Sequence, residues 1–138
     1  MGTAPEIKDK LICAVLYTGI FVPIMSWVPI LWVIFVNLRK SYMKDFVKYH
    51  CYQAILFNMI AFALPQILKL LAEFIANILS ITIIFENSAP LLVSMVTWFI
   101  GIYFIFIKVV ALYAIIWTAR GRFTYMPPIS QAVNLLLR

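Results

Sequence analysis

The chain has 138 residues, of which 65% are apolar and 12% charged, and its formal net charge is +6. A soluble domain carries about 25% charged residues to cover its surface, so this composition excludes an ordinary soluble globular domain. We therefore expect an all-α polytopic membrane protein, a single membrane domain over residues 1–138 with about three spans, or four, and an interfacial helix.

The first expected span is the uncharged run over residues 11–36. Because about 20 apolar residues cross a bilayer, this run is long enough to span with some tilt. Pro23 and Pro29 lie inside it and should kink the helix, which a membrane span tolerates. A signal peptide is the competing interpretation, but the run is too long and lacks a small-residue cleavage site.

The second expected span covers residues 51–70, and a tilted or interfacial helix follows over 72–85. A single helix over this whole stretch would be longer than the bilayer core. Either Pro65 breaks it, or the part after Lys69 lies along the membrane surface with its polar residues on one helical face. A short fourth span in this second part is the alternative.

The last expected span covers residues 91–119 and is interrupted only by Lys108. Ser88 and Pro90 supply residues typical of a helix start. Gly121, with an arginine on each side, supplies a helix end. In the tail over 123–138, the Met-Pro-Pro sequence forbids continued helix, and a short amphipathic helix is expected from Ile129 to Leu137.

The basic residues predict an orientation. Basic loops stay on the cytoplasmic side of a membrane or its organellar equivalent, and the connector over 86–90 holds no basic residue. The first loop and the C-terminus should therefore both lie inside, which with three spans leaves the N-terminus outside. The same charges should contact anionic lipid of the inner leaflet, and no nucleic-acid-binding pattern accompanies them. The loop residues are Arg39, Lys40, Lys44 and Lys48.

The sequence offers little for catalysis. The sole histidine, His50, lies at the expected membrane boundary, where a solvated or headgroup-contacting side chain is the more common case. Cys13 and Cys51 lack CxxC spacing and a histidine cluster, so we expect buried free thiols rather than a metal site. There is no Gly-rich phosphate loop, carboxylate pair within a span, or serine elbow. We predict no enzyme activity, catalytic residue, cofactor or metal.

Polar residues inside the expected spans are candidates for contacts within the membrane. Lys108 lies roughly 16–18 Å from Arg120 along the helix, well inside the hydrocarbon. Asn58 and Gln66 reach similar depths and could bond to it; alternatively, Lys108 extends toward one headgroup layer. Gln53, near the inner boundary, could form a hydrogen bond between helices.

Two segments carry a family resemblance. Residues 46–56 read FVKYHCYQAIL, and residues 120–133 read RGRFTYMPPISQAV. Together they resemble the twenty-kilodalton Tic family, the chloroplast inner-envelope protein-import channel and its cyanobacterial and bacterial relatives. In that family a basic-aromatic stretch with QA opens a span, and an RGRY turn after the last span precedes IP-ISEA. The matching positions are Phe46, Lys48, His50, Gln53, Ala54, Arg120, Gly121, Arg122, Pro127, Ile129 and Ser130.

The resemblance extends over about residues 30–133 and has departures. The family typically shows four spans, and this chain lacks a full first one unless residues 11–36 form a compressed pair. Gln131 stands where the family commonly has an acidic residue, and Pro128 adds a second proline. The resemblance implies that both segments lie on the stromal or cytoplasmic side.

Two functions follow from different classes. The resemblance implies a small subunit that takes part in protein translocation or insertion, in an oligomer or larger complex, in contact with translocating polypeptides. The alternative is a non-catalytic accessory or structural subunit of a larger membrane complex, which the scarcity of polar residues in the spans favours. Because residues 1–10 include acidic residues and do not resemble a transit peptide, we expect a bacterial or cyanobacterial inner membrane, or a plastid membrane.

Overall fold

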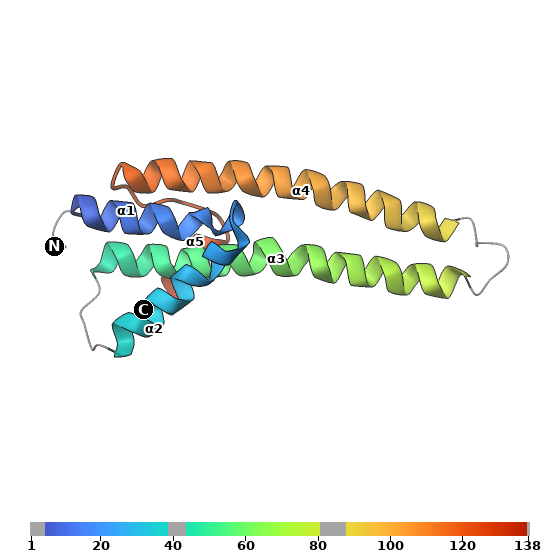
Figure 1. Cartoon of the computed structure of the whole chain (residues 1–138), viewed down its shortest axis with the longest axis horizontal. Helices are drawn as coiled ribbons and strands as arrows, with labels where there is room; N and C mark the ends of the chain where they lie inside the picture. The colour runs from blue at the N-terminus through green and yellow to red at the C-terminus, as the bar shows by residue number, and fades with distance from the viewer. Residues whose placement is uncertain (1–4, 39–43, 81–87, 138) are drawn as a thin grey trace. The chain divides into compact units, whose positions relative to one another are not determined.

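The computed structural model describes residues 5–38, 44–80 and 88–137, and every regular element in these ranges is helical. The expected all-helical class is therefore confirmed for this part of the chain. Figure 1 shows the elements in chain order, which are α1 (Ile7–Leu16), the 3₁₀ turns η1 (Tyr17–Ile20) and η2 (Pro23–Trp27), α2 (Val28–Leu38), α3 (Asp45–Ser80), α4 (Ser88–Ala119) and α5 (Ile129–Leu136).

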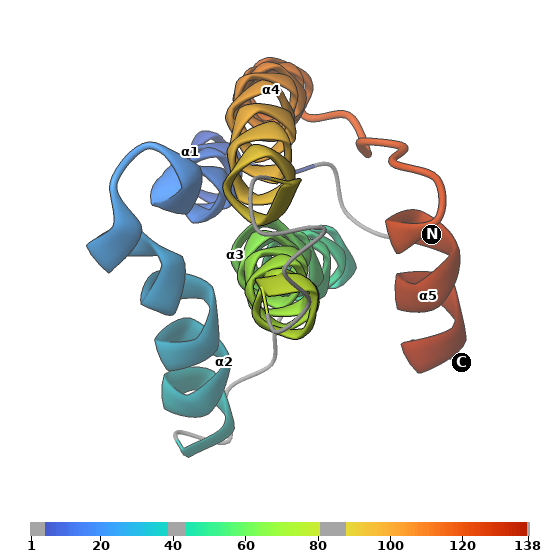
Figure 2. The same ribbon diagram turned by 90° about the vertical axis from the view of Figure 1, so that its right-hand side faces the viewer.

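The chain packs as two compact units rather than as one. The first unit comprises Met1–Asn58 and Lys108–Arg138, and the second comprises Met59–Ile107. Helices α3 and α4 each contribute residues to both units. The first unit contains all of the shorter elements, and Figure 2 shows its α1 and α5 on either side of α3.

The expected single span over residues 11–36 is wrong, because this run forms α1 and α2 joined by two 3₁₀ turns. At about 1.5 Å per residue, neither helix covers the roughly 30 Å hydrocarbon core. Gly19 makes the reversal possible: a Cβ there would lie 2.6 Å from the Ser26 Cα atom. Pro23 then opens η2 at its first position. The run is therefore a pair of short helices.

Helix α3 continues through Pro65 to Ser80 without a break. The first of the two alternatives, a break at Pro65, does not occur. Residues 72–80 continue α3 instead of forming the separate tilted or interfacial helix expected over 72–85, and residues 81–85 lie outside the described part. Good helix formers such as leucine and alanine flank the proline and keep the helix going. Lys69 and Glu73 add an i,i+4 ion pair with 3.8 Å between Nζ and Oε1.

Helix α4 ends as the sequence predicts. Gly121 has φ +75°, its backbone N–H donates to the Thr118 carbonyl at 2.8 Å, and the Arg122 N–H donates to the Trp117 carbonyl at 3.1 Å. This 6→1 and 5→2 pattern is a Schellman motif, which favours glycine at the left-handed position. The expected short C-terminal helix is also present as α5.

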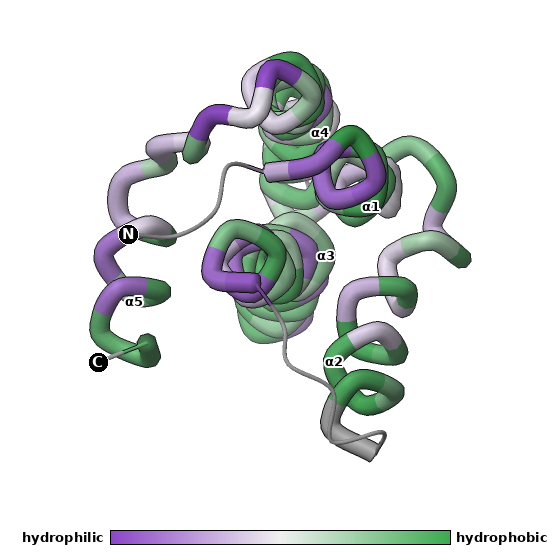
Figure 3. Tube along the Cα trace, turned by 90° about the vertical axis from the view of Figure 1, so that its left-hand side faces the viewer, coloured by the Kyte–Doolittle hydropathy of each residue, from purple (hydrophilic) through white to green (hydrophobic). Residues whose placement is uncertain are grey.

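Two helices, α3 and α4, are long and apolar enough to cross a membrane. Only 28% of the most apolar stretch of α3 and 17% of that of α4 are buried within the chain. Large side chains such as Trp98 and Phe99 are mostly exposed. Figure 3 shows the apolar colouring along both helices and hydrophilic residues at the beginnings of α1 and α3 and the end of α4. A core helix of a soluble protein would instead bury most of its apolar surface.

Candidate functional site

The first unit contains a buried group of hydrogen-bonded polar side chains, which we call the polar cluster. Its members come from η1, α3, the segment after α4, and α5, so they join parts of the chain that are far apart in sequence. Every member is at most 1% exposed. The polar cluster consists of Tyr17, His50, Gln53, Thr124 and Ser130.

Gln53 is the centre of the polar cluster because its amide makes four hydrogen bonds. Its Oε1 accepts from the Tyr17 hydroxyl at 2.7 Å and from the Thr124 hydroxyl at 3.2 Å. Its Nε2 donates to the Thr124 carbonyl at 3.1 Å and to Ser130 Oγ at 3.0 Å. A primary amide has two acceptor and two donor positions, so this buried side chain is fully satisfied. It forms the interhelical contact expected of Gln53 and extends it to the C-terminal segment.

His50 packs beside Gln53 and is fully buried, so the expected solvated or headgroup-contacting histidine is wrong. Its Nδ1 lies 2.9 Å from the Tyr17 hydroxyl and 3.3 Å from the Thr124 hydroxyl. Phe123 stacks on the ring with 5.9 Å between centroids and covers it. The Nε2 atom makes no hydrogen bond with the described residues, although the Arg122 backbone interacts with the ring.

Aromatic rings close the polar cluster from the outside. The Phe46 ring lies 4.6 Å from His50 and 5.3 Å from Phe123, measured between centroids. Tyr49 packs edge-on against Phe123 at 5.2 Å, and its hydroxyl donates to the Thr124 carbonyl at 3.3 Å. These contacts, like those of Gln53, hold the start of α3 against the segment after α4.

The two segments that carry the family resemblance therefore pack against each other. Gln53 donates a hydrogen bond to Ser130, and the Phe46 ring packs against Phe123, the residue after Arg122. The matching positions divide by burial. Those buried in the first unit are Phe46, His50, Gln53, Ala54, Ile129 and Ser130. Those at least partly exposed are Lys48, Arg120, Gly121, Arg122 and Pro127.

An ion-pair group lies at the same polar end of the first unit. Lys44 Nζ lies 2.8 Å from Glu6 Oε1 and 2.8 Å from Asp9 Oδ2. The hydrogen bond from Lys44 lowers the pKa of the Asp9 carboxyl. This contact places the start of α1 beside the start of α3, which conflicts with the expectation of an N-terminus across a membrane from the first loop. Of the other loop lysines and arginines, Lys48 is exposed, and Arg39 and Lys40 lie outside the described residues.

Among the other candidate polar residues, Asn58 makes one hydrogen bond within the described chain, and Lys108 and Gln66 make none. Asn58 Nδ2 donates to the Ser26 carbonyl at 3.5 Å, and its Oδ1 has no partner there. Lys108 and Gln66 are exposed, and neither makes a hydrogen bond or ion pair with the residues that the structure describes. The hydrogen bond between Lys108 and Asn58, one of the two possibilities given above, does not occur among the described residues.

The geometry of the polar cluster suits a structural clamp. Ser130 Oγ accepts from Gln53 and from the Met126 backbone N–H at 2.8 Å, and no carboxylate joins the described cluster. Its members have no exposed surface on which to receive a substrate. The thiols of Cys13 and Cys51 are free and buried, and no group of three potential metal ligands occurs among the described residues.

Sequence reasoning missed two members of the polar cluster, Tyr17 and Thr124. Tyr17 is one of a few polar residues in the apolar run over 11–36, which is a weak signal. Thr124 lies inside a resembling segment but at a position that carries no match. Only the packing of distant segments identifies either residue.

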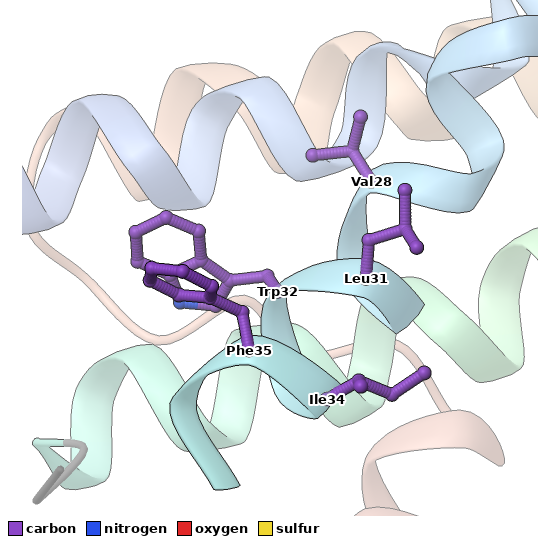
Figure 4. Close-up of a pocket in the computed structure, with 5 residues that line it drawn as sticks. All are labelled: Val28, Leu31, Trp32, Ile34 and Phe35. Carbon is purple, nitrogen blue, oxygen red and sulfur yellow. The ribbon is translucent and has the colours of Figure 1, made fainter. Parts of the chain in front are cut away.

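A separate apolar hollow of about 540 Å³ runs along α2. Figure 4 shows the Trp32 and Phe35 rings side by side, with 6.4 Å between centroids, and Ile34 pointing away from them. Val28 and Leu31 complete the lining, which has almost no polar surface. This lining suits contact with hydrocarbon rather than recognition of a polar ligand.

In comparisons with known proteins, no family model, curated protein or solved structure matches the chain.

Proposed function

We propose that this chain is an integral membrane protein in which α3 and α4 cross the bilayer. The observation that carries the proposal is the large apolar surface that these two helices leave unburied. Contact between such an apolar surface and hydrocarbon is favourable, whereas its contact with water is unfavourable. Helices also satisfy their own backbone hydrogen bonds, which a bilayer requires of any spanning segment.

The polar end of the first unit then lies at one membrane interface. Lys44, Lys48, Arg120 and Arg122 belong to this end, where the start of α1 and the end of α4 also lie. The positive-inside rule assigns it to the cytoplasmic or stromal side, where it contacts anionic lipid. The membrane is a bacterial or cyanobacterial inner membrane, or a plastid membrane.

We propose that the chain acts as a small non-catalytic subunit of a larger membrane complex. Most of the buried polar side chains of the described chain belong to the polar cluster instead of lining a path along the helices. Ala111 and Ala114 are buried in the chain's own packing, whereas Gly101 faces open space. The polar cluster joins distant segments of the chain, and α3 and α4 leave large apolar surfaces exposed. This combination suits a subunit that packs against other membrane proteins.

Protein translocation or insertion is the second candidate function. The resemblance to the Tic family supports it, together with the direct contact between the two resembling segments through Gln53 and Ser130. Two crossing helices cannot enclose a wide pore, so any translocation path would be formed with other subunits or copies.

Two measurements on native membranes test these proposals. Alkaline carbonate washing should leave the chain in the membrane pellet; release into the supernatant would refute the membrane proposal. Purification in mild detergent followed by quantitative mass spectrometry should then recover partners in fixed stoichiometry. Translocon subunits or precursor polypeptides would support translocation, and one complex with another activity would support the accessory role. Recovery of the chain alone would contradict both roles.

A further inference from the structure

Lys108 is a charged residue in the interior of a long apolar helix. It lies eleven residues before the end of α4 at Ala119, which corresponds to about 16 Å along the axis. The sequence between them contains no other charge. If α4 crosses the bilayer as proposed, the ammonium group needs an interior, a watery cavity or a partner. The described chain supplies none of these, because Lys108 is exposed and unpaired.

The face of α4 around Lys108 is open. Thr97 and Gly101 are exposed and share this face, because residues four and eleven positions apart recur on one side of a helix. A Cβ at Gly101 would meet no atom within 4 Å. The chain's own packing uses a different side of α4, where Ile107 and Ala111 are buried. We call the open side the Lys108 face.

The described carboxylates are already engaged or lie at a helix end. Two of them bind Lys44, one pairs with Lys69, and one is the first residue of α3. They are Glu6, Asp9, Glu73 and Asp45. A second copy docked through the same face would bring two ammonium groups together, which repel each other. None of these four carboxylates pairs with Lys108, so an acidic group on a partner protein is the counter-charge that the described residues favour.

We propose that the Lys108 face docks against a membrane helix of a partner protein that carries an aspartate or glutamate within its span. This inference rests on the proposed crossing of the bilayer by α4. Charge complementarity favours the acidic helix, because an ion pair inside hydrocarbon replaces the lost hydration of both groups. The small residues Thr97 and Gly101 let the backbone of that helix come close. A lipid phosphate is the other source of negative charge, and the crosslinking test below distinguishes it from a carboxylate on a partner helix.

The test is photo-crosslinking of the full chain in native membranes. A photoreactive phenylalanine analogue replaces Ile105, which is 67% exposed and borders the Lys108 face. The crosslinked peptides are identified by mass spectrometry in the wild-type background and in Lys108→Leu, Lys108→Arg and Gly101→Leu. Lys69→Leu is the matched control, because it removes one lysine from the other long helix, where Glu73 already pairs with it.

The expected product is a crosslink to an apolar segment of another protein that contains an aspartate or glutamate. Its yield should fall at least tenfold in Lys108→Leu and Gly101→Leu and stay within twofold in Lys108→Arg and Lys69→Leu. Conversion of the identified carboxylate to its amide should cause the same loss. Crosslinks to lipid only, to a second copy, or at equal yield in Lys108→Leu would overturn the inference.

Carbonate washing of the same variants separates this inference from the proposed function. Lys108→Leu makes α4 more apolar, so the variant should stay in the membrane pellet even when the crosslink is lost. Retention of the wild-type chain without an acidic partner would refute the docking inference alone. Release of the wild-type chain would refute the membrane proposal itself.

Discussion

Replacement of Gln53 with leucine should destabilise the first unit by about 2–4 kcal/mol. The side chain makes four buried hydrogen bonds. Such bonds contribute about 0.6 kcal/mol each between membrane helices and about 1 kcal/mol each in soluble proteins. The larger cost of stranding a buried partner is avoided, because Ser130 keeps its bond from the Met126 N–H and the Thr124 carbonyl keeps its bond from Tyr49.

The native cysteines provide the assay. Cys13 and Cys51 are 0% exposed in the same unit, so a small thiol reagent reaches them only when the unit opens. Since 1.4 kcal/mol corresponds to a factor of ten in an equilibrium constant, a loss of 3 kcal/mol should raise the labelling rate in detergent or nanodiscs about 100-fold. Gln66→Leu is the matched control, because Gln66 is an exposed glutamine on the same helix. A Gln53→Leu rate within threefold of wild type, or an equal rise in the control, would refute the clamp.

Three further predictions follow from the first unit and its proposed orientation. Gly19→Ala should prevent the α1–α2 pair from closing, because the new Cβ would meet the Ser26 backbone at 2.6 Å; labelling of the α1 cysteine measures this. The contact between the starts of α1 and α3 should persist from pH 7 to about pH 5 and weaken below about pH 4. The folded pKa of Asp9 is lowered, so its contribution is present above the unfolded value near 3.9 and disappears as the pH falls through the folded value; spin-label distances between the two helix starts measure it. An impermeant maleimide should label Ser88→Cys and Asn134→Cys from opposite sides of sealed membranes.

Each of these predictions has a control. Gly101→Ala should leave thiol labelling unchanged, because a Cβ there meets no atom within 4 Å. Asp9→Asn should weaken the α1–α3 contact at neutral pH and remove most of the pH dependence; an unchanged pH profile would show that Asp9 does not hold the contact. Labelling of both added cysteines from the same side would contradict the crossing by α4. Charge reversal at Lys44 and Lys48 should disturb the orientation, and unaltered labelling would refute the charge argument.

Local signals predicted the helix ends, whereas packing between distant residues decided what the sequence could not predict. The end of α4 and the helix α5 followed from Gly121 and the two prolines, because their backbone preferences act over a few residues. Apolar composition does not show the chain reversal within residues 11–36, which becomes evident only from the close approach of Gly19 to Ser26. The sequence left open whether Pro65 breaks the helix, and the structure shows α3 continuing on both sides of it.

The burial of His50 in the candidate site likewise could not be predicted from local sequence. Its burial depends on Phe123, which follows it by more than 70 residues, and on a hydroxyl from Tyr17 in an apolar run. No spacing rule connects these positions. The two resembling segments contain four members of the polar cluster, but the sequence alone did not show that the segments contact each other.

The polar groups of the chain fall into two kinds with different consequences. Gln53 satisfies all its hydrogen bonds inside the chain, so its loss should change stability before it changes assembly. Lys108 has no partner in the described chain, so its loss should change assembly and leave the fold intact. The two effects should therefore separate: Gln53→Leu raises thiol labelling, and Lys108→Leu lowers crosslinking without raising it. If both variants changed both readouts together, the polar cluster and the Lys108 face would not be independent parts of the molecule, and the division between fold and docking would fail.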